Sequence, residues 1–256
     1  MDSGFYAACA GLRAQSQALE VVAHNLSNLN TAGFRGQQTT FQSLVASRPG
    51  VPNAVNNVLS SVLNSAVNNF GVLEGTHLDM TAGNLEATGN PLDVGIEGSG
   101  FFAIQTARGT RYTRNGSFQV SSGGVLVTAA GHPVLSDPAL GANGVINIPA
   151  GAVSIAPDGT LSVNGAVAGS IQLFEFAPRT KLTSEGESMI SAPEGSALPS
   201  PQSTLRQGAL ESSNVNSIGS VVTLIGVQRQ AEMLQRAMSL FDTEFNRIAT
   251  SDLGKV

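Results

Sequence analysis

A periodic run of apolar residues toward the C-terminal end constrains the fold of this chain more than any other sequence feature. Between about residues 216 and 250, apolar side chains recur at alternating intervals of three and four, the spacing of one helix face. These residues are Leu224, Val227, Ala231, Leu234, Met238, Phe241, Phe245 and Ile248. At ~1.5 Å per residue such a helix would be roughly 50 Å long. Because that length exceeds the diameter of a domain of this size, we expect the face to contact other subunits as well.

The same spacing marks the first thirty residues. Its positions are Phe5, Ala8, Leu12, Gln15, Leu19, Val22, Leu26 and Leu29. Asp2 or Ser3 can cap the start of a helix there, and Gly33 can stop it because glycine tolerates positive φ. The sequence therefore predicts long helices at both chain ends, pairing with each other and with neighbouring subunits.

Between the two ends, short β-branched and aromatic runs alternate with turn signals. The pairs Asn115-Gly116, Gly123-Gly124, Asp158-Gly159 and Asn164-Gly165 tolerate the positive φ angles of tight hairpins. The predicted fold class is therefore α+β, with long N- and C-terminal helices that form a coiled-coil-like axial domain, and a central all-β domain. The expected boundaries are 1–35 and 210–256 for the axial domain, 36–70 for an arm or linker, and 71–208 for the β domain.

The charge content limits the classes of partner. Charged residues make up only 12% of the chain, and the formal net charge is −5. No two Lys or Arg residues are adjacent, so a nucleic acid or an anionic bilayer would find no basic patch. The apolar runs fall short of the ~20 residues that span a membrane, and no N-terminal stretch has the pattern of a cleaved signal peptide. We therefore expect protein partners, without nucleic acid or membrane insertion.

Residues that could support catalysis or bind a metal are scattered along the chain. His24, His77 and His132 lie in different segments, without a second ligand at metal-binding spacing. Cys9 lies beside an apolar helix stripe, which favours a packing role over that of a nucleophile. We expect no catalytic residues, cofactor, metal or small-molecule substrate, and no enzymatic activity. The alternative class is a β-rich protein that binds or hydrolyses peptidoglycan, which would need a carboxylate pair brought together by the fold.

Two Asn-rich segments beside the predicted helices carry a family resemblance. Residues 24–35 read HNLSNLNTAGFR, and residues 211–216 read ESSNVN. Both closely resemble hallmarks of the bacterial flagellar rod and hook proteins. Residues 98–102 (GSGFF) and 112–118 (YTRNGSF) resemble that family's central β domain, so the resemblance covers nearly the whole chain in the family's order.

This resemblance implies a structural subunit of the flagellar basal-body rod, which polymerises through its terminal helices into the axial drive shaft. The implied partners are other copies of the chain, neighbouring rod proteins and the flagellar export apparatus. The implied location is the periplasmic part of the rod, reached by export without a cleaved signal peptide. The opening of the chain at Met1-Asp2 and Phe5-Tyr6-Ala7-Ala8 is most similar to proximal rod proteins, and the distal rod protein is the alternative.

The expected assembly interface combines apolar helix positions with asparagines at the helix junctions. Asn side chains can cap helix ends and hydrogen-bond backbone across a subunit contact, while apolar positions supply contact area. The expected interface residues are Phe5, Leu12, Leu19, Asn25, Leu26, Asn28, Leu29, Asn214, Asn216, Leu224, Val227, Leu234, Met238, Phe241, Phe245 and Ile248.

Overall fold

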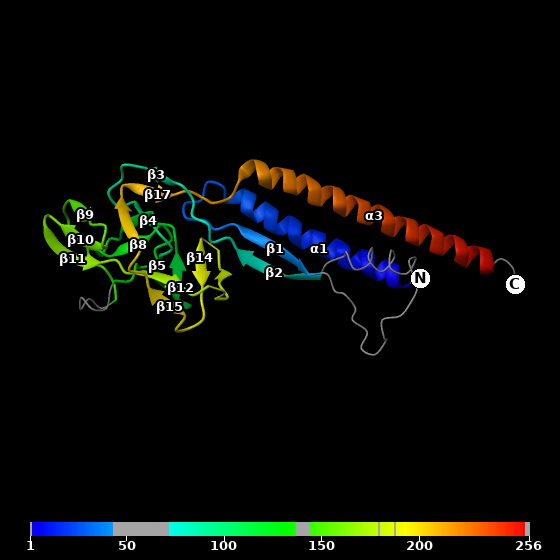
Figure 1. The fold of residues 1–256 in the computed structure, drawn as a ribbon, viewed down its shortest axis with the longest axis horizontal. Helices are drawn as coiled ribbons and strands as arrows, with labels where there is room; N and C mark the ends of the chain where they lie inside the picture. Colours follow the sequence, from blue (N-terminus) through cyan, green and yellow to red (C-terminus); the bar gives the residue numbers. More distant parts are fainter. Residues whose placement is uncertain (1, 43–71, 137–143, 179, 187, 254–256) are drawn as a thin grey trace. The chain divides into compact units, whose positions relative to one another are not determined.

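The computed structural model describes residues 2–42, 72–136, 144–178, 180–186 and 188–253 (Figure 1). The chain divides into two compact units. Unit 1 comprises Met1–Leu26, Gln37–His77 and Ser217–Val256, and unit 2 comprises Ser27–Gly36 and Leu78–Asn216. Most of the arm predicted over residues 36–70 lies outside the described residues.

Unit 1 contains two helices and one small sheet among its described residues. Helix α1 covers Asp2–Ser27 and helix α3 covers Ser217–Leu253. Strands β1 (Gln37–Gln42) and β2 (Val72–Leu78) form a two-stranded sheet. Within the described residues, neither helix is apolar enough over sufficient length to cross a membrane.

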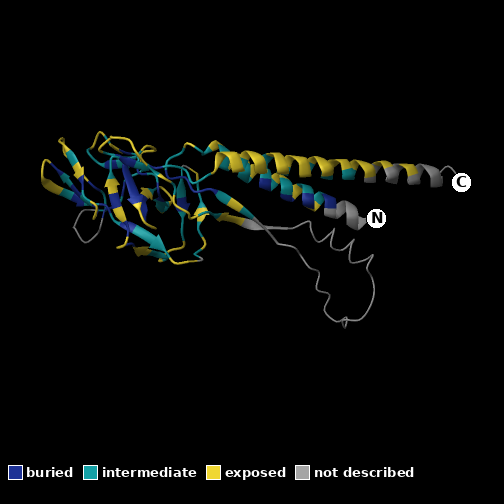
Figure 2. Ribbon diagram, turned by 45° about the horizontal axis from the view of Figure 1, so that its top comes forward, coloured by how far each residue is buried: buried dark blue, intermediate teal, exposed yellow. Residues whose placement is uncertain are grey.

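The predicted coiled-coil-like axial domain is wrong, and α3 shows why. None of the described side chains of α3 is buried, and its exposed face is visible along the helix in Figure 2. Several large apolar side chains of α3 are highly exposed to solvent, including Ile218 at 77% exposure, Val222 at 65% and Leu240 at 67%. A coiled coil would bury large residues as knobs in the holes of a partner helix. The described residues therefore form a helix at each end and a β-rich centre, and they form no coiled-coil domain.

Helix α1 departs from the same prediction in a different way. Its buried side chains are small, with Ala8 at 3%, Ala14 at 6% and Ala18 at 3% exposure. The larger Leu12 and Leu19 of the predicted stripe are only half-buried. Small residues on the buried face allow a neighbouring backbone to approach closely, which the large knobs of a coiled coil would prevent.

Unit 2 is β-rich, in agreement with the predicted central β region, and its largest sheet has six strands in antiparallel pairs. In spatial order the strands are β13 (Thr183–Ser184), β14 (Met189–Ser191), β6 (Gly109–Thr113), β5 (Phe101–Thr106), β12 (Leu173–Phe176) and β15 (Ala197–Pro199). The central strand β5 is buried from Phe101 to Ile104. This continuous burial explains its unbroken apolar run.

Four smaller antiparallel sheets complete the described part of unit 2. The three-stranded sheet has the order β11 (Ala166–Ser170), β10 (Thr160–Val163) and β9 (Val153–Ile155). The two-stranded sheets pair β16 (Thr204–Gln207) with β4 (Val94–Glu97), β17 (Ala209–Glu211) with β3 (Leu85–Ala87), and β7 (Phe118–Val120) with β8 (Leu126–Thr128).

Three of the four predicted turn pairs adopt the expected backbone. In the β10–β11 hairpin, Asn164 has φ 50° and Gly165 has φ 84°, as a tight Asn-Gly turn requires. The pairs at residues 123–124 and 158–159 likewise place a glycine at positive φ. Asn115-Gly116 is different, because a Cβ on Gly116 would lie 1.8 Å from the Val94 carbonyl oxygen. This glycine serves close packing and not a hairpin.

One apolar core joins these sheets. The Phe102 and Phe118 rings meet edge to face with centroids 4.9 Å apart, a favoured aromatic geometry. Residues from most of the sheets pack around them. The fully buried members include Val94, Ile104, Leu126, Val134, Ile146 and Leu161.

We predict that Phe102→Ala lowers the free energy of unfolding by about 3–5 kcal/mol, because it deletes a buried ring and leaves a cavity. Urea titration of the full chain, followed by circular dichroism, measures this change. Val167→Ala is the control, since Val167 is 67% exposed, and it should alter stability by less than about 0.5 kcal/mol. Equal effects of the two substitutions would contradict this account of the core.

Candidate functional site

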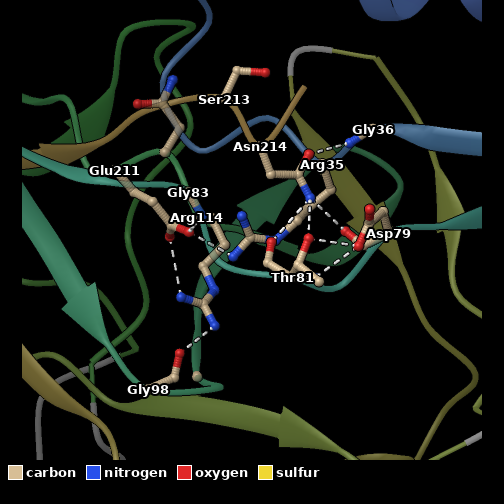
Figure 3. A network of polar contacts seen from close by, with 12 residues as sticks. Arg35, Gly36, Asp79, Thr81, Gly83, Gly98, Arg114, Glu211, Ser213 and Asn214 are labelled. Atoms are coloured by element: carbon tan, nitrogen blue, oxygen red, sulfur yellow. Dashed lines mark hydrogen bonds and ion pairs between the residues drawn. The ribbon is translucent and has the colours of Figure 1, made fainter. Parts of the chain in front are cut away.

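The two Asn-rich segments singled out in the sequence meet each other inside unit 2 (Figure 3). The Gly33 amide donates to the Glu211 carbonyl over 2.7 Å, and the Asn214 amide donates to the Phe34 carbonyl over 3.4 Å. Residues that follow α1 are thus paired by backbone with residues that precede α3. Four side chains complete this contact, Arg35, Arg114, Glu211 and Asn214, which we call the junction cluster.

Asn214 ties three chain segments together with one side-chain amide. Its Oδ1 accepts a 2.7 Å hydrogen bond from the Gly36 amide. Its Nδ2 donates to the carbonyl oxygens of Asp79 and Thr81, each over 2.9 Å. A side-chain amide has both the donors and the acceptor that this position needs, so an asparagine satisfies all of these hydrogen bonds.

Glu211 binds two guanidinium groups in the interior. Its Oε1 lies 2.7 Å from Arg35 Nη2, and its Oε2 lies 3.1 Å from Arg114 Nη1. The three side chains are 1–2% exposed. Oε1 also accepts a 2.7 Å hydrogen bond from the Gly83 amide. Both carboxylate oxygens are therefore engaged, as a buried charge requires.

Arg114 is held on several sides. Its Nη2 donates to the Gly98 carbonyl over 2.7 Å, and its guanidinium carbon lies 4.8 Å from the centroid of the Phe101 ring, within cation–π range. The pKa of Arg114 is lowered to about 10, because burial and, to a smaller extent, the Arg35 charge lower it, while Glu211 opposes both effects. Arg114 therefore stays protonated at neutral pH, and the two guanidiniums outnumber the one carboxylate paired with them.

Gly33 allows the first segment to approach this cluster. It has φ +65°, and a Cβ built on it would lie 2.3 Å from the Arg114 carbonyl carbon. A larger residue would be strained in its own backbone and would also overlap this neighbour. The predicted helix stop at Gly33 thus serves a close approach in unit 2, since α1 already ends at Ser27.

The structure distributes the predicted interface asparagines over different places. Asn214 lies in the junction cluster. Asn25, in unit 1, exchanges two hydrogen bonds with the backbone of Gln37, at 2.7 and 2.8 Å. Asn28 accepts a 3.1 Å hydrogen bond from Thr31 Oγ1 in the turn after α1, and Asn216 is exposed.

The predicted apolar interface positions are also spread out. All of those with described side chains are half-buried, namely Leu12, Leu19, Leu26, Leu29, Leu224, Val227, Leu234 and Met238. The side chains of Phe5, Phe241, Phe245 and Ile248 lie outside the described ones.

Reasoning from sequence missed the chemistry of Arg35, Arg114 and Glu211. These residues lie within the resembling segments, but their residue types alone predict no role for them. One usable signal was available, because any charged residue within the resembling segments is conspicuous in a chain with 12% charged residues. Among the described residues, no group of three or more His, Cys, Asp or Glu side chains could hold a metal ion.

Models of known protein families match the parts of the chain that contribute the junction cluster. The family model for the flagella basal body rod protein matches residues 5–35. The model for the C-terminal part of the flagellar basal body rod FlgEFG proteins matches residues 206–250. Between them, the model for the flagellar hook protein FlgE/F/G D1 domain matches residues 95–163. The first match includes Arg35 of the junction cluster, the middle match includes Arg114, and the C-terminal match includes Glu211 and Asn214.

Several curated relatives match over nearly their full length. The chain is 30% identical to the flagellar basal-body rod protein FlgF of Caulobacter vibrioides, over 100% of both chains. It is 33% identical to FlgF of Escherichia coli, over 96% of this chain and 97% of the relative. It is 31% identical to the rod protein FlgG of Buchnera aphidicola, over 93% of this chain and 95% of the relative.

We predict that Glu211→Gln lowers the free energy of unfolding by about 3–5 kcal/mol, because it leaves two buried guanidiniums without a compensating charge. Glu97→Gln is a matched control, since Glu97 lies 3.8 Å from Arg206 in an ion pair whose side chains are 53% and 58% exposed. Such exposed pairs contribute about 0–1 kcal/mol. Urea titration of both variants measures the difference, and equal losses would contradict a special role for Glu211.

Proposed function

Since the chain belongs to the flagellar basal-body rod protein family and is a structural subunit of that rod, we propose that it occupies the proximal rod. There it contacts copies of itself and neighbouring rod proteins. The end-to-end match with a FlgF protein supports this position. The distal rod is the alternative, because FlgG relatives match at a similar identity.

The observation that carries the proposal is the exposed apolar surface of α3. Ile218, Val222, Met233 and Leu240 are each at least 60% exposed, on a helix of 37 residues. Contiguous apolar surface on a polypeptide in water favours association with another protein. Low charge content also favours close packing, since only 12% of residues are charged and few charges must be desolvated.

In this proposal the interface comprises the exposed apolar surface of α3 together with the apolar helix positions and the junction asparagines predicted from sequence. Leu224, Val227, Leu234 and Met238 are half-buried in the single chain, which leaves part of each available to a neighbour. A head-to-tail contact that does not close into a ring produces a helical assembly. Repetition of one such contact is enough to build a rod.

The proposal also covers location and chemistry. The chain reaches the periplasmic part of the rod through the flagellar export apparatus and works there without catalysis. The family resemblance supports this part of the proposal, and the names of the relatives support a place in the basal-body rod.

We predict that Leu234→Asp abolishes rod assembly while unit 2 stays folded, because a carboxylate at a half-buried apolar position cannot be desolvated at a subunit contact. Basal bodies purified from a strain carrying only the variant would lack the rod, and the cells would not swim. Gln235→Asp is the matched control, since Gln235 is the next residue of α3 and is exposed. Normal motility of the Leu234→Asp strain would refute this interface.

The position within the rod has its own test. The chain should restore motility to a strain that lacks its FlgF-type rod protein, and should fail in a strain that lacks its FlgG-type protein. Swimming radius on soft agar measures both. The reverse result would assign the chain to the distal rod.

A further inference from the structure

A small cavity lies beside the junction cluster, entirely within unit 2. It has a volume of about 10 Å³, and its lining includes Arg35, Leu78, Ser184, Ser188 and Met189. This is about the space that one water-sized guest needs. The cavity therefore joins a residue of the first Asn-rich segment to residues of the β13–β14 hairpin.

Three polar atoms of the residues that line this cavity lack hydrogen-bond partners. Arg35 Nε and Nη1 and Ser188 Oγ are all buried, and none has a hydrogen-bond partner among the described residues. Arg35 as a whole is only 3% exposed. A guanidinium can donate but cannot accept, and a serine hydroxyl can donate. The guest that suits this cavity is therefore a hydrogen-bond acceptor.

The charge balance further limits which kind of guest the cavity can bind. Arg35 and Arg114 are both paired to the single carboxylate of Glu211, so the buried cluster carries an excess positive charge. Arginine keeps its proton at neutral pH, and the group cannot become neutral to escape burial. A water molecule would satisfy the donors but not the charge, whereas a small anion would satisfy both.

The backbone at Ser188 is consistent with a built site. Ser188 has φ 58°, one of two non-glycine residues with positive φ in the described chain, and such a conformation is costly for serine. Its carbonyl accepts a 3.0 Å hydrogen bond from Thr113 Oγ1 on β6. The surrounding sheet thus holds this residue in a conformation that it would not adopt alone.

We propose that this cavity binds one small monovalent anion, of the halide class, between Arg35 and Ser188. The anion accepts hydrogen bonds from Arg35 Nε and Nη1 and from Ser188 Oγ, and neutralises the excess charge of the junction cluster. It connects the segment after α1 to the β13–β14 hairpin. This site is independent of where the chain lies in the rod.

The first experiment measures thermal unfolding of the purified full chain in sodium chloride and in sodium gluconate at equal ionic strength. Gluconate is too large for the cavity. At ten times the dissociation constant, chloride should raise the melting temperature by about 2–4 °C more than gluconate does, and bromide should act like chloride. Identical melting temperatures in chloride and gluconate would overturn the proposal.

The second experiment localises the ion. Ser188→Ala removes one donor and should reduce the chloride-specific rise by at least half. The control Ser162→Ala, on β10, removes a hydroxyl that bonds the Ser154 carbonyl over 3.4 Å, and should leave the rise intact. Crystals grown in bromide should give an anomalous scattering peak within hydrogen-bond distance of Arg35 Nε. Density there without anomalous signal would identify a water molecule and refute the anion.

Discussion

The pairing of one buried carboxylate with two buried guanidiniums is the constraint on which the arrangement of unit 2 depends. Removing such charges from water costs several kcal/mol per ion, and only tight geometry with further hydrogen bonds offsets that cost. Glu211 provides this geometry, because Arg35 and the Gly83 amide meet Oε1 and Arg114 meets Oε2. These partners come from widely separated parts of the sequence, so the charges are satisfied together in one arrangement of the chain.

The sheets of unit 2 bring the cluster together. In the β17–β3 pair, Glu211 is in register with Leu85, and the chain just before β3 supplies the Gly83 amide. Arg114 directly follows β6, whose partner β5 contributes the Phe101 ring beneath the guanidinium. Strand register thus determines which charges can meet, since a shift by one residue would turn each side chain to the opposite face.

Local features of the fold could be predicted from the sequence, and long-range ones could not. The Asn164-Gly165 turn depends on the φ preferences of two adjacent residues, so its sequence is sufficient to predict it. Asn115-Gly116 has the same residue types, yet its glycine is required because the Val94 carbonyl oxygen packs against it. The local sequence does not predict this long-range contact. Likewise, apolar periodicity located both helices, but the face that α1 buries is lined by small residues such as Ala14, because burial depends on what packs against a helix.

The junction cluster also depends on long-range contacts. The family resemblance therefore identifies the two Asn-rich segments but does not predict the ion cluster that joins them. Replacing a buried ion cluster by apolar residues of similar volume is often neutral or stabilising, so such a cluster is weak support for stability as its purpose. Its stronger effect here is on specificity. A chain with 12% charged residues has few charges with which to penalise wrong pairings, and three of them lie in one buried contact. Any pairing of the segments after α1 and before α3 that separates Glu211 from Arg35 or Arg114 leaves a charge uncompensated, so the ion cluster selects the native pairing of these segments.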